Sequence, residues 1–200
     1  MEKYLYTQNW FLVSELKKHL NKLNKFVDKS KDIHVLEIGS YEGLSSVFFA
    51  DNFLEKEGST LTCVDPFLRI PNNDHAYYLQ NNEEKNFDIN ITRCDNSEKI
   101  KVFKITSDEF FAINEKKYNL IYIDGCHEPE FISRDMENGF ICLEENGIMW
   151  MNDYGKTTIT VKKAMNQFLI KHRGEYVTIH QGYQIAIQKN EIVVKEETPT

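Results

Sequence analysis

The sequence predicts an α/β fold, a doubly wound and mostly parallel sheet that ends in an antiparallel hairpin. Short apolar runs alternate along the chain with segments of helical spacing, which is the pattern of β-α units. Runs such as HVLEI and YNLIYI show no polar alternation, which is typical of strands covered by helices on both faces. Both runs end at an acidic residue or a glycine turn, as expected where a strand reaches the rim of a sheet.

The elements follow in a regular order. An amphipathic helix is expected over residues 8–27, where apolar residues recur at helical spacing. Strands are expected at 34–38, 59–64, 101–105, 118–123 and 147–151. Helices are expected after Gly43, near 75–86, in the segment DEFFAI, at 129–143 and at 161–172. Residues 176–180 and 183–188 flank a Gln-Gly pair and are interpreted as the final hairpin.

One domain is expected over residues 1–189, with an N-terminal helical segment at 1–30 and a flexible tail at 190–200. No run of 18 apolar residues occurs, and the polar start MEKYLYTQ lacks a signal-peptide pattern, so we expect a cytoplasmic protein with no membrane partner. A net charge of -7 argues against a nucleic-acid partner, because phosphate binding needs a basic face. The four cysteines have no CxxC spacing and are expected to be reduced.

The segment EIGSYEG forms the first candidate site. Its G-x-x-x-G spacing differs from the G-x-G-x-x-G of dinucleotide-dependent oxidoreductases. Gly39 permits a tight turn, and Gly43 lets a ligand approach the next helix, whose N–H groups and Ser45 can bind a carboxylate. Glu37 can meet an ammonium group, and Asp65 can hold two ribose hydroxyls. Together they favour an adenosyl amino acid, and an ordinary βα turn is the alternative.

A family resemblance extends this interpretation. The chain resembles class I S-adenosylmethionine-dependent methyltransferases, within them the small branch that includes sugar O-methyltransferases. The similarity runs from QNWF through VLEIGSYEGLSS and CVDPF to LIYIDGCH, NGIMWMNDYG and GYQIAIQK. It implies a Rossmann-like sheet of seven strands whose last strand is antiparallel.

The resemblance also implies that S-adenosyl-L-methionine is the cofactor. The residues expected to bind it are Glu37, Gly39, Ser40, Tyr41, Gly43, Ser45, Asp65, Ser107 and Asp124. Tyr41 stands where many relatives have a glycine. Thr106 and Ser107 stand where an acidic residue often meets the adenine, so adenine recognition is expected to depend on the backbone and Ser107.

A second candidate site combines Asp124, His127, Asn152 and Asp153. Asp124 follows the run YNLIYI, and the Asn-Asp pair follows the next strand, so Asp124, Asn152 and Asp153 are expected to offer oxygen ligands to Mg²⁺ or another divalent cation. Such an ion would lower the pKa of an acceptor hydroxyl, and His127, with an ordinary pKa near 6.5, is the expected general base. In the alternative interpretation Asp124 contacts the cofactor or caps a helix, His127 is a loop residue and no metal binds.

Aromatic residues near both sites are candidates for packing or for contact with a ligand. The resemblance implies that Tyr4, Tyr6, Trp10 and Phe11 form a lid over the cofactor. In the alternative, Trp10 and Phe11 only pack the first helix onto the sheet. Phe67, Tyr77 and Tyr78 follow the second strand and are candidates for shaping an acceptor pocket.

The sequence therefore predicts methyl transfer to a hydroxyl of a small polar acceptor, with a sugar or glycan favoured. N-methylation of an amino sugar or small amine is the nearest alternative. A nicotinamide-dependent oxidoreductase and a non-catalytic cofactor-binding protein are alternatives from other classes. Whether identical chains assemble into an oligomer is left open.

Overall fold

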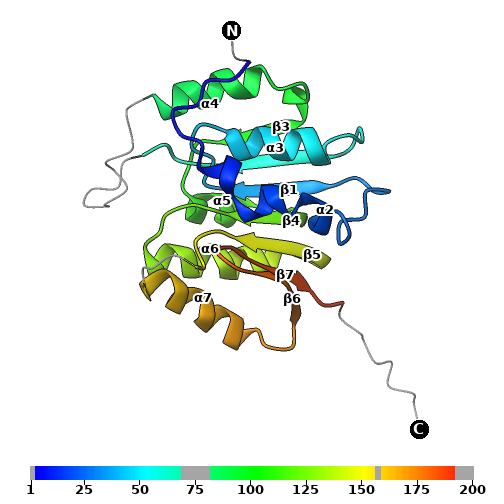
Figure 1. Ribbon diagram of the computed structural model, residues 1–200, viewed down its shortest axis with the longest axis vertical. Coiled ribbons are helices and arrows are strands. Elements are labelled where there is room, and N and C mark those ends of the chain that lie inside the picture. The colour runs from blue at the N-terminus through cyan, green and yellow to red at the C-terminus, as the bar shows by residue number, and fades with distance from the viewer. Residues whose placement is uncertain (1–2, 69–81, 156–158, 192–200) are drawn as a thin grey trace.

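The strands form one seven-stranded sheet in the order β3-β2-β1-β4-β5-β7-β6 (Figure 1). The computed structural model describes residues 3–68, 82–155 and 159–191. The strands are β1 (His34–Ile38), β2 (Thr60–Val64), β3 (Ile100–Phe103), β4 (Tyr118–Ile123), β5 (Leu143–Met151), β6 (Tyr176–Gln181) and β7 (Ile185–Lys189). Strands β1 to β5 pair in parallel, and β7 runs antiparallel to both β5 and β6. The predicted fold class is confirmed.

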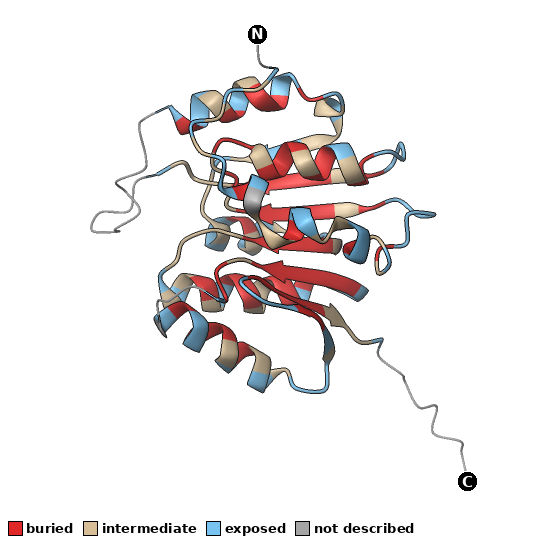
Figure 2. Cartoon of the chain, viewed as in Figure 1, coloured by how far each residue is buried: buried red, intermediate tan, exposed pale blue. Residues whose placement is uncertain are grey.

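Helices cover both faces of this sheet (Figure 1). One face carries η1 (Trp10–Val13), α1 (Glu15–Lys18), α2 (Leu20–Leu23), α3 (Leu44–Phe53) and α4 (Glu83–Thr92). The other face carries α5 (Ser107–Ile113), α6 (Pro129–Cys142) and α7 (Ile159–Lys171), and the short turn η3 (Ser97–Lys99) leads into β3. Figure 2 shows the buried residues concentrated along the central strands and the inner sides of the helices.

Alternate side chains of each central strand enter opposite halves of the core. In β4, Leu120 and Tyr122 pack with α3, whereas Ile121 and Ile123 pack with α6 and α7. All four side chains are at most 3 % exposed, which explains why this strand is apolar at consecutive positions. The sheet is thereby fixed between two helical layers, and its strand ends form a rigid rim.

The N-terminal helix is broken into three short turns. The sequence predicted one helix over residues 8–27, but Ser14 adopts an extended backbone with ψ of 153° and accepts a hydrogen bond from the N–H of Lys17. This side chain caps the new helix α1 and ends η1, because a capping serine competes with continued helical hydrogen bonding. Leu16 and Leu23 still reach the core, as their helical spacing predicted.

Helix α4 lies later in the chain than the predicted helix near residues 75–86. It spans Glu83–Thr92 and buries Phe87 and Ile91. Residues 69–81, which include Tyr77 and Tyr78, lie outside the described part of the chain. Among the described residues, no helix combines the length and apolar character needed to cross a membrane.

Candidate active site

The turns that follow β1, β2, β4 and β5 meet at one rim of the sheet. Gly39 donates its N–H to the last residue of β2 (2.9 Å), and Asp65 donates to the last residue of β3 (3.1 Å). Asp124 donates to the last residue of β1 (2.8 Å), and Asn152 to the last residue of β4 (3.0 Å). The strand pairing thus continues one residue beyond each strand, which brings residues far apart in sequence to neighbouring positions.

The glycine turn after β1 packs tightly against two of its neighbours. Gly39 has a φ of +86°, and a Cβ atom here would lie 2.6 Å from the carbonyl carbon of Asp124. Glycine alone satisfies both the backbone conformation and this close approach. The N–H groups of Ser40 and Tyr41 each donate to Oδ2 of Asp65 over 2.9 Å. The carboxylate after β2 therefore fixes the turn after β1.

Asp65 has limited capacity left for a ligand. Its Oδ1 accepts a hydrogen bond from the N–H of Phe67 (2.8 Å), so three of its four lone-pair directions bind backbone N–H groups. Burial raises the pKa of the Asp65 carboxyl, and the backbone donors oppose that rise. One lone pair of Oδ1 remains and can accept from a single ribose hydroxyl, whereas the sequence suggested that Asp65 holds two hydroxyls.

Glu37 is completely buried beneath the glycine turn. Ser40 donates its hydroxyl to Oε2 over 2.7 Å, Ser46 donates to the same oxygen and Ser45 donates to Oε1. Burial raises the pKa of Glu37, and these hydroxyl groups counteract it. The serine side chains are thus turned toward Glu37. The N–H groups of Gly39, Ser40, Tyr41 and Gly43 also have acceptors within the protein, so the donors that remain are the first N–H groups of α3, which have no acceptor inside the helix.

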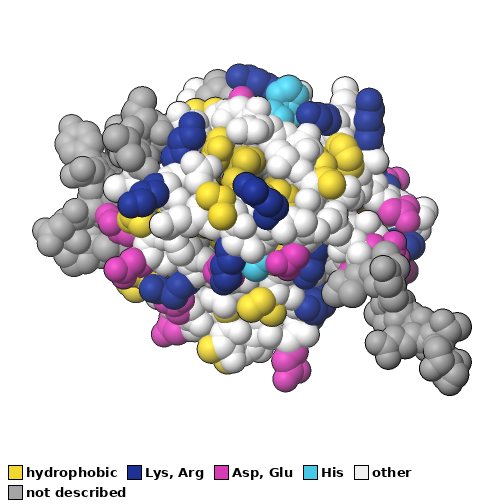
Figure 3. Space-filling model, turned by 90° about the horizontal axis from the view of Figure 1, so that it is seen from below, with side chains coloured by type: hydrophobic (Ala, Val, Ile, Leu, Met, Phe, Trp, Pro, Cys, Tyr) yellow, Lys and Arg dark blue, Asp and Glu magenta, His cyan; other side chains and the backbone are white. Residues whose placement is uncertain are grey.

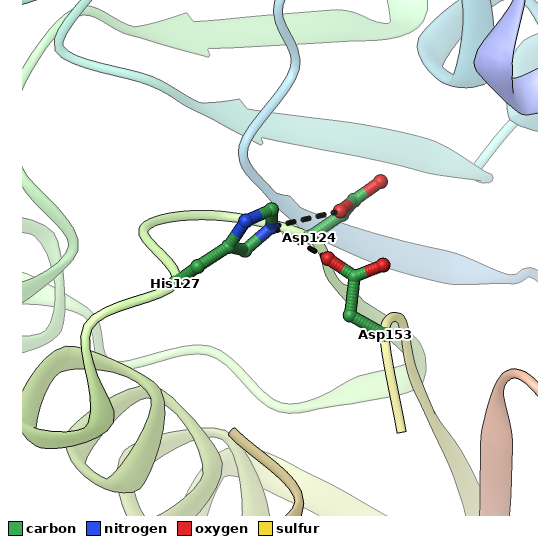
Figure 4. Close-up of side chains that lie close together, drawn as sticks. All are labelled: Asp124, His127 and Asp153. Atoms are coloured by element: carbon green, nitrogen blue, oxygen red, sulfur yellow. Dashed lines mark ion pairs between the residues drawn. The ribbon is translucent and has the colours of Figure 1, made fainter. Parts of the chain in front are cut away.

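The second cluster brings Asp124, His127 and Asp153 together at the same rim (Figure 4). Nε2 of His127 lies 2.9 Å from Oδ2 of Asp153 and 3.9 Å from Oδ1 of Asp124. One potential ligand atom from each residue lies within 4.8 Å of the others. Asp153 is only 4 % exposed and adopts a φ of +62°, an uncommon backbone conformation for a residue with a side chain. The end of β5 is shaped to direct this carboxylate toward His127.

Asn152 does not present its oxygen to this cluster. Its Nδ2 donates to Oδ1 of Asp124 over 2.8 Å, and its Oδ1 accepts from Nε2 of Gln184 over 2.6 Å. The structure therefore groups Asp124, Asp153 and His127 as candidate ligands, in place of the predicted set of Asp124, Asn152 and Asp153.

Two tyrosines that the sequence did not identify complete the cluster. Tyr122 donates its hydroxyl to Oδ2 of Asp124 (2.9 Å), and Tyr183 donates to Oδ1 of Asp153 (2.6 Å). Burial and the adjacent Asp153 carboxylate raise the pKa of Tyr183, so its hydroxyl remains a donor. Tyr183 lies in the hairpin between β6 and β7, and the signal for its role is only its place in the motif GYQIAIQK.

His127 differs electrostatically from the histidine that the sequence suggested. Burial alone would lower the pKa of His127, but its interactions with Asp124 and Asp153 outweigh burial and raise the pKa to about 9. The imidazole is consequently protonated at neutral pH when only the two carboxylates surround it. A role as a general base requires that this proton first leave.

Ser107, the predicted adenine contact, starts helix α5 beside a buried acid. Thr106 and Glu109 form a capping box around this helix start. The hydroxyl of Ser107 interacts with the carboxylate of Asp135 on α6, and Asp135 is only 2 % exposed. Oδ1 of Asp135 has no hydrogen-bond partner among the described residues. Burial raises the pKa of Asp135 to about 6, so the acid is partly protonated near neutrality.

Replacing Asp135 with asparagine is expected to remove a pH dependence of stability. The folded pKa of Asp135 lies above its ordinary value of 3.8, so its stabilising contribution is present at pH 4 and is lost as the pH rises through about 6. Each pH unit between the two pKa values corresponds to about 1.4 kcal/mol. The free energy of unfolding of Asp135→Asn should therefore rise by up to about 3 kcal/mol relative to that of the parent protein between pH 4 and 8. Urea unfolding across this range measures the difference. The exposed acid Asp95 provides the control Asp95→Asn, and parallel curves for all three proteins would contradict the assignment.

The N-terminal segment crosses the glycine turn. Thr7 donates its N–H and its hydroxyl to the carboxylate of Glu42, over 2.6 and 3.0 Å. The Trp10 ring lies 5.3 Å from that of Tyr41, whereas Phe11 is buried in the core. Phe11 thus packs the segment onto the sheet, and Trp10 lies beside Tyr41 of the turn. A role of Trp10 as a lid over the cofactor stays a prediction.

This strand order, with a glycine turn after β1 and an acid after β2, defines a class I methyltransferase domain. The profile of the family described as "Methyltransferase domain" matches residues 36–154, which is more than half of the chain. The chain belongs to this family, which confirms the predicted enzyme class. A search of curated protein sequences finds no match.

Solved structures share the fold at low sequence identity. An O-methyltransferase from Bacillus cereus in complex with SAH superimposes with a TM-score of 0.60 and 11% identity, over 90% of this chain and 82% of that one. The O-methyltransferase TomG from Streptomyces achromogenes in complex with SAM gives 0.61 and 10%, over 89% and 81%. A putative rRNA-methylase from Clostridium thermocellum gives 0.61 and 16%, over 94% and 99%.

Proposed function

We propose that this protein transfers the methyl group of S-adenosylmethionine to a hydroxyl of a small polar acceptor, with a sugar as the favoured class. The observation that carries the proposal is the cluster of Asp124, His127 and Asp153 beside the glycine turn. Membership of the methyltransferase family and the SAM and SAH complexes of similar fold support the cofactor. The motifs LIYIDGCH and NDYG, which resemble those of sugar O-methyltransferases, support the acceptor class.

The chemistry asks the protein mainly to position two reactants and remove a proton. S-adenosylmethionine supplies an electrophilic methyl group on a sulfonium, and transfer is an in-line displacement by the acceptor oxygen. The glycine turn and Asp65 would bind the cofactor, while Asp124 and Asp153 orient His127. His127 would accept the hydroxyl proton at Nε2 after losing the proton that it shares with these carboxylates.

The same cluster fits a divalent cation. The carboxylates of Asp124 and Asp153 are oxygen ligands that Mg²⁺ or Mn²⁺ accepts, and one oxygen of each lies within 4.8 Å of the other and of a ring nitrogen of His127. Asp124 and Asp153 would hold the ion with His127 in reach, and the ion would polarise the acceptor hydroxyls. Such an ion and a proton on His127 compete for the same carboxylates.

The surface charge favours a small acceptor over a nucleic acid. The chain has a net charge of -7. Figure 3 shows the α7 end of the molecule, where basic and acidic side chains are interspersed on the described surface rather than gathered in a basic stripe. Because phosphate-backbone binding depends on clustered Lys and Arg, RNA is the less favoured acceptor, although a putative rRNA-methylase shares the fold.

A labelled-methyl assay tests the proposed reaction. The purified protein is incubated with S-adenosylmethionine labelled in its methyl group and with neutral sugars, amino sugars and ribosomal RNA. We expect label on a sugar oxygen, which carbon NMR distinguishes from label on nitrogen. Label on an amino group would select N-methylation, and salt-sensitive label on RNA would replace the small-acceptor proposal.

Asp65→Ala is expected to weaken cofactor binding. The change removes a carboxylate that accepts from the turn and from a ribose hydroxyl, so the affinity for S-adenosylhomocysteine should fall by about 1.5–3 kcal/mol, or roughly 10- to 150-fold. Calorimetry measures the affinity, and Asp51→Ala, at an exposed position of α3, is the control. Equal affinities in the two variants would refute the assignment of Asp65.

Asp153→Ala is expected to act like removal of the ion by a chelator. Losing this carboxylate removes a ligand and the charge that retains a cation, so both treatments should suppress methyl transfer at least tenfold. The affinity for S-adenosylhomocysteine should change less than about twofold, because Asp153 follows β5 rather than the glycine turn. Turnover with and without chelator measures the first effect. Full activity of the chelated enzyme on its acceptor would show that methyl transfer does not require a metal ion.

A further inference from the structure

Gln184, immediately before β7, is a fully buried amide whose orientation is fixed by two donors. Its Oε1 accepts from the backbone N–H of Leu16 in α1 (2.7 Å) and from the indole N–H of Trp150 in β5 (2.8 Å). Neither group can act as an acceptor, so the atom that faces them must be the oxygen. The amide nitrogen of Gln184 is consequently directed to the opposite side.

That orientation dictates how Asn152 lies. The amide nitrogen of Gln184 donates to Oδ1 of Asn152 over 2.6 Å. With its oxygen engaged in this way, Asn152 directs its own nitrogen to Oδ1 of Asp124 over 2.8 Å. The two N–H donors at one end of the chain of hydrogen bonds and the accepting carboxylate of Asp124 at the other therefore favour the same orientation of Asn152.

The backbone around Gln184 is anchored by the same N-terminal helix. Oε2 of Glu15, the first residue of α1, accepts from the N–H of Gln184 (2.6 Å) and lies 2.9 Å from Nε2 of His180 in β6. The N-terminal helix and the final hairpin thus hold both the backbone and the side chain of Gln184 in place. This anchoring explains why a polar side chain is retained in a completely buried position.

We propose that Gln184 is a positioning residue that orients Asn152 so that an N–H group, and not a carbonyl oxygen, faces Asp124. The inference depends on the proposed function only in that Asp124 belongs to the transfer site. It assigns Asn152 the role of a hydrogen-bond donor to a ligand residue. Reversing the Asn152 amide would instead place its oxygen beside the cluster of Asp124, His127 and Asp153, as an additional cation ligand.

Gln184→Glu tests this assignment because it keeps the shape and changes the hydrogen bonding. At pH 8 the two N–H donors oppose the effect of burial and favour the ionised carboxylate. Its second oxygen would face the Asn152 amide, and the Tyr122 hydroxyl, 3.5 Å from Nε2 of Gln184, is a further possible donor. Gln181→Glu adds the same charge at an exposed position three residues away and serves as the control. Crystals of the parent protein and both variants at pH 8 are examined by neutron diffraction, which locates the deuterons of Asn152. Binding of Mn²⁺ alone is measured by electron paramagnetic resonance.

We expect the Asn152 deuterons to face Asp124 in the parent protein and in Gln181→Glu, and to face residue 184 in Gln184→Glu. Mn²⁺ should bind at least tenfold more tightly to Gln184→Glu than to Gln181→Glu, with S-adenosylhomocysteine affinity within twofold in both. An unchanged Asn152 orientation in Gln184→Glu would overturn the inference, as would equal Mn²⁺ affinities in the two variants when the parent protein binds Mn²⁺.

A second variant covers a failure of Gln184→Glu to fold. Gln184→Met removes the amide and approximates its volume, and we expect Asn152 to occupy both orientations in that protein. A single orientation identical to that of the parent would overturn the inference. If the parent protein binds no Mn²⁺, the metal part of the proposed function fails, while the diffraction result still decides the role of Gln184.

Discussion

Replacing His127 with alanine is expected to lower the rate of methyl transfer by roughly 10²–10⁴, the range for loss of a positioned general base. His127 is the basic side chain that the turn after β4 places between Asp124 and Asp153. The affinity for S-adenosylhomocysteine should remain nearly unchanged, since the glycine turn does not depend on the imidazole. Single-turnover rates with saturating cofactor measure the loss. The difference from the parent enzyme should shrink only above about pH 9, where His127 has already lost its proton and hydroxide partly replaces the base.

His172→Ala is the matched control for this change. His172 also lies near a carboxylate, with its Nε2 3.0 Å from Oε2 of Glu137, but it follows α7 and lies away from the rim. A second measurement uses the raised pKa of His127. In metal-free protein the protonated His127 stabilises the fold fully below pH 6.5, and this stabilisation is lost as the pH rises through about 9. The free energy of unfolding of His127→Ala should therefore not decline over this range. Equal methyl-transfer rates for the His127 and His172 variants would remove His127 from the mechanism.

Gly39→Ala is expected to destabilise the protein by roughly 3–5 kcal/mol. The substitution adds the cost of a positive φ to a close contact with the backbone of Asp124, which cannot move without disturbing β4. The melting temperature should fall by roughly 6–20 °C in a chain of this length, and cofactor binding should weaken in parallel. Thermal unfolding followed by circular dichroism measures the shift.

Gly174→Ala separates the cost of the positive φ from the cost of the close contact. Gly174 has a similar φ of +94°, but a Cβ atom there would meet nothing within 4 Å. Only the conformational cost of roughly 1–2 kcal/mol should remain. If both variants lost the same stability, the close approach between the turns after β1 and β4 would not constrain Gly39.

The regular part of the fold could be predicted from the sequence because it depends on local patterns. Strands β1 and β4 have the predicted boundaries, since each is a mostly apolar run that ends at a glycine or an acidic residue. The helix over residues 8–27 was predicted incorrectly as continuous, because hydrophobic periodicity does not register the cap made by Ser14. Leu16 and Leu23 were identified correctly as core positions, whereas the helix ends were not.

The candidate site was predictable only in part. The topology of parallel strands places Asp65, Asp124 and Asp153 at one rim, and this followed from their positions after apolar runs. Their hydrogen-bond partners did not follow, because Gln184 and Tyr183 come from the final hairpin, about 30 residues beyond the residues that they contact. The number of lone pairs already used on Asp65 likewise depends on a backbone conformation that no local pattern specifies.

A crystal structure with S-adenosylhomocysteine and Mn²⁺ would show whether one rim of the sheet holds both the cofactor and a separate transfer cluster. We expect the amino-acid end of the ligand over residues 39–43, its ribose on Asp65, and the ion between Asp124 and Asp153 with His127 in reach. A ligand bound away from the glycine turn, or an ion held by other residues while this cluster keeps its present contacts, would contradict this expectation.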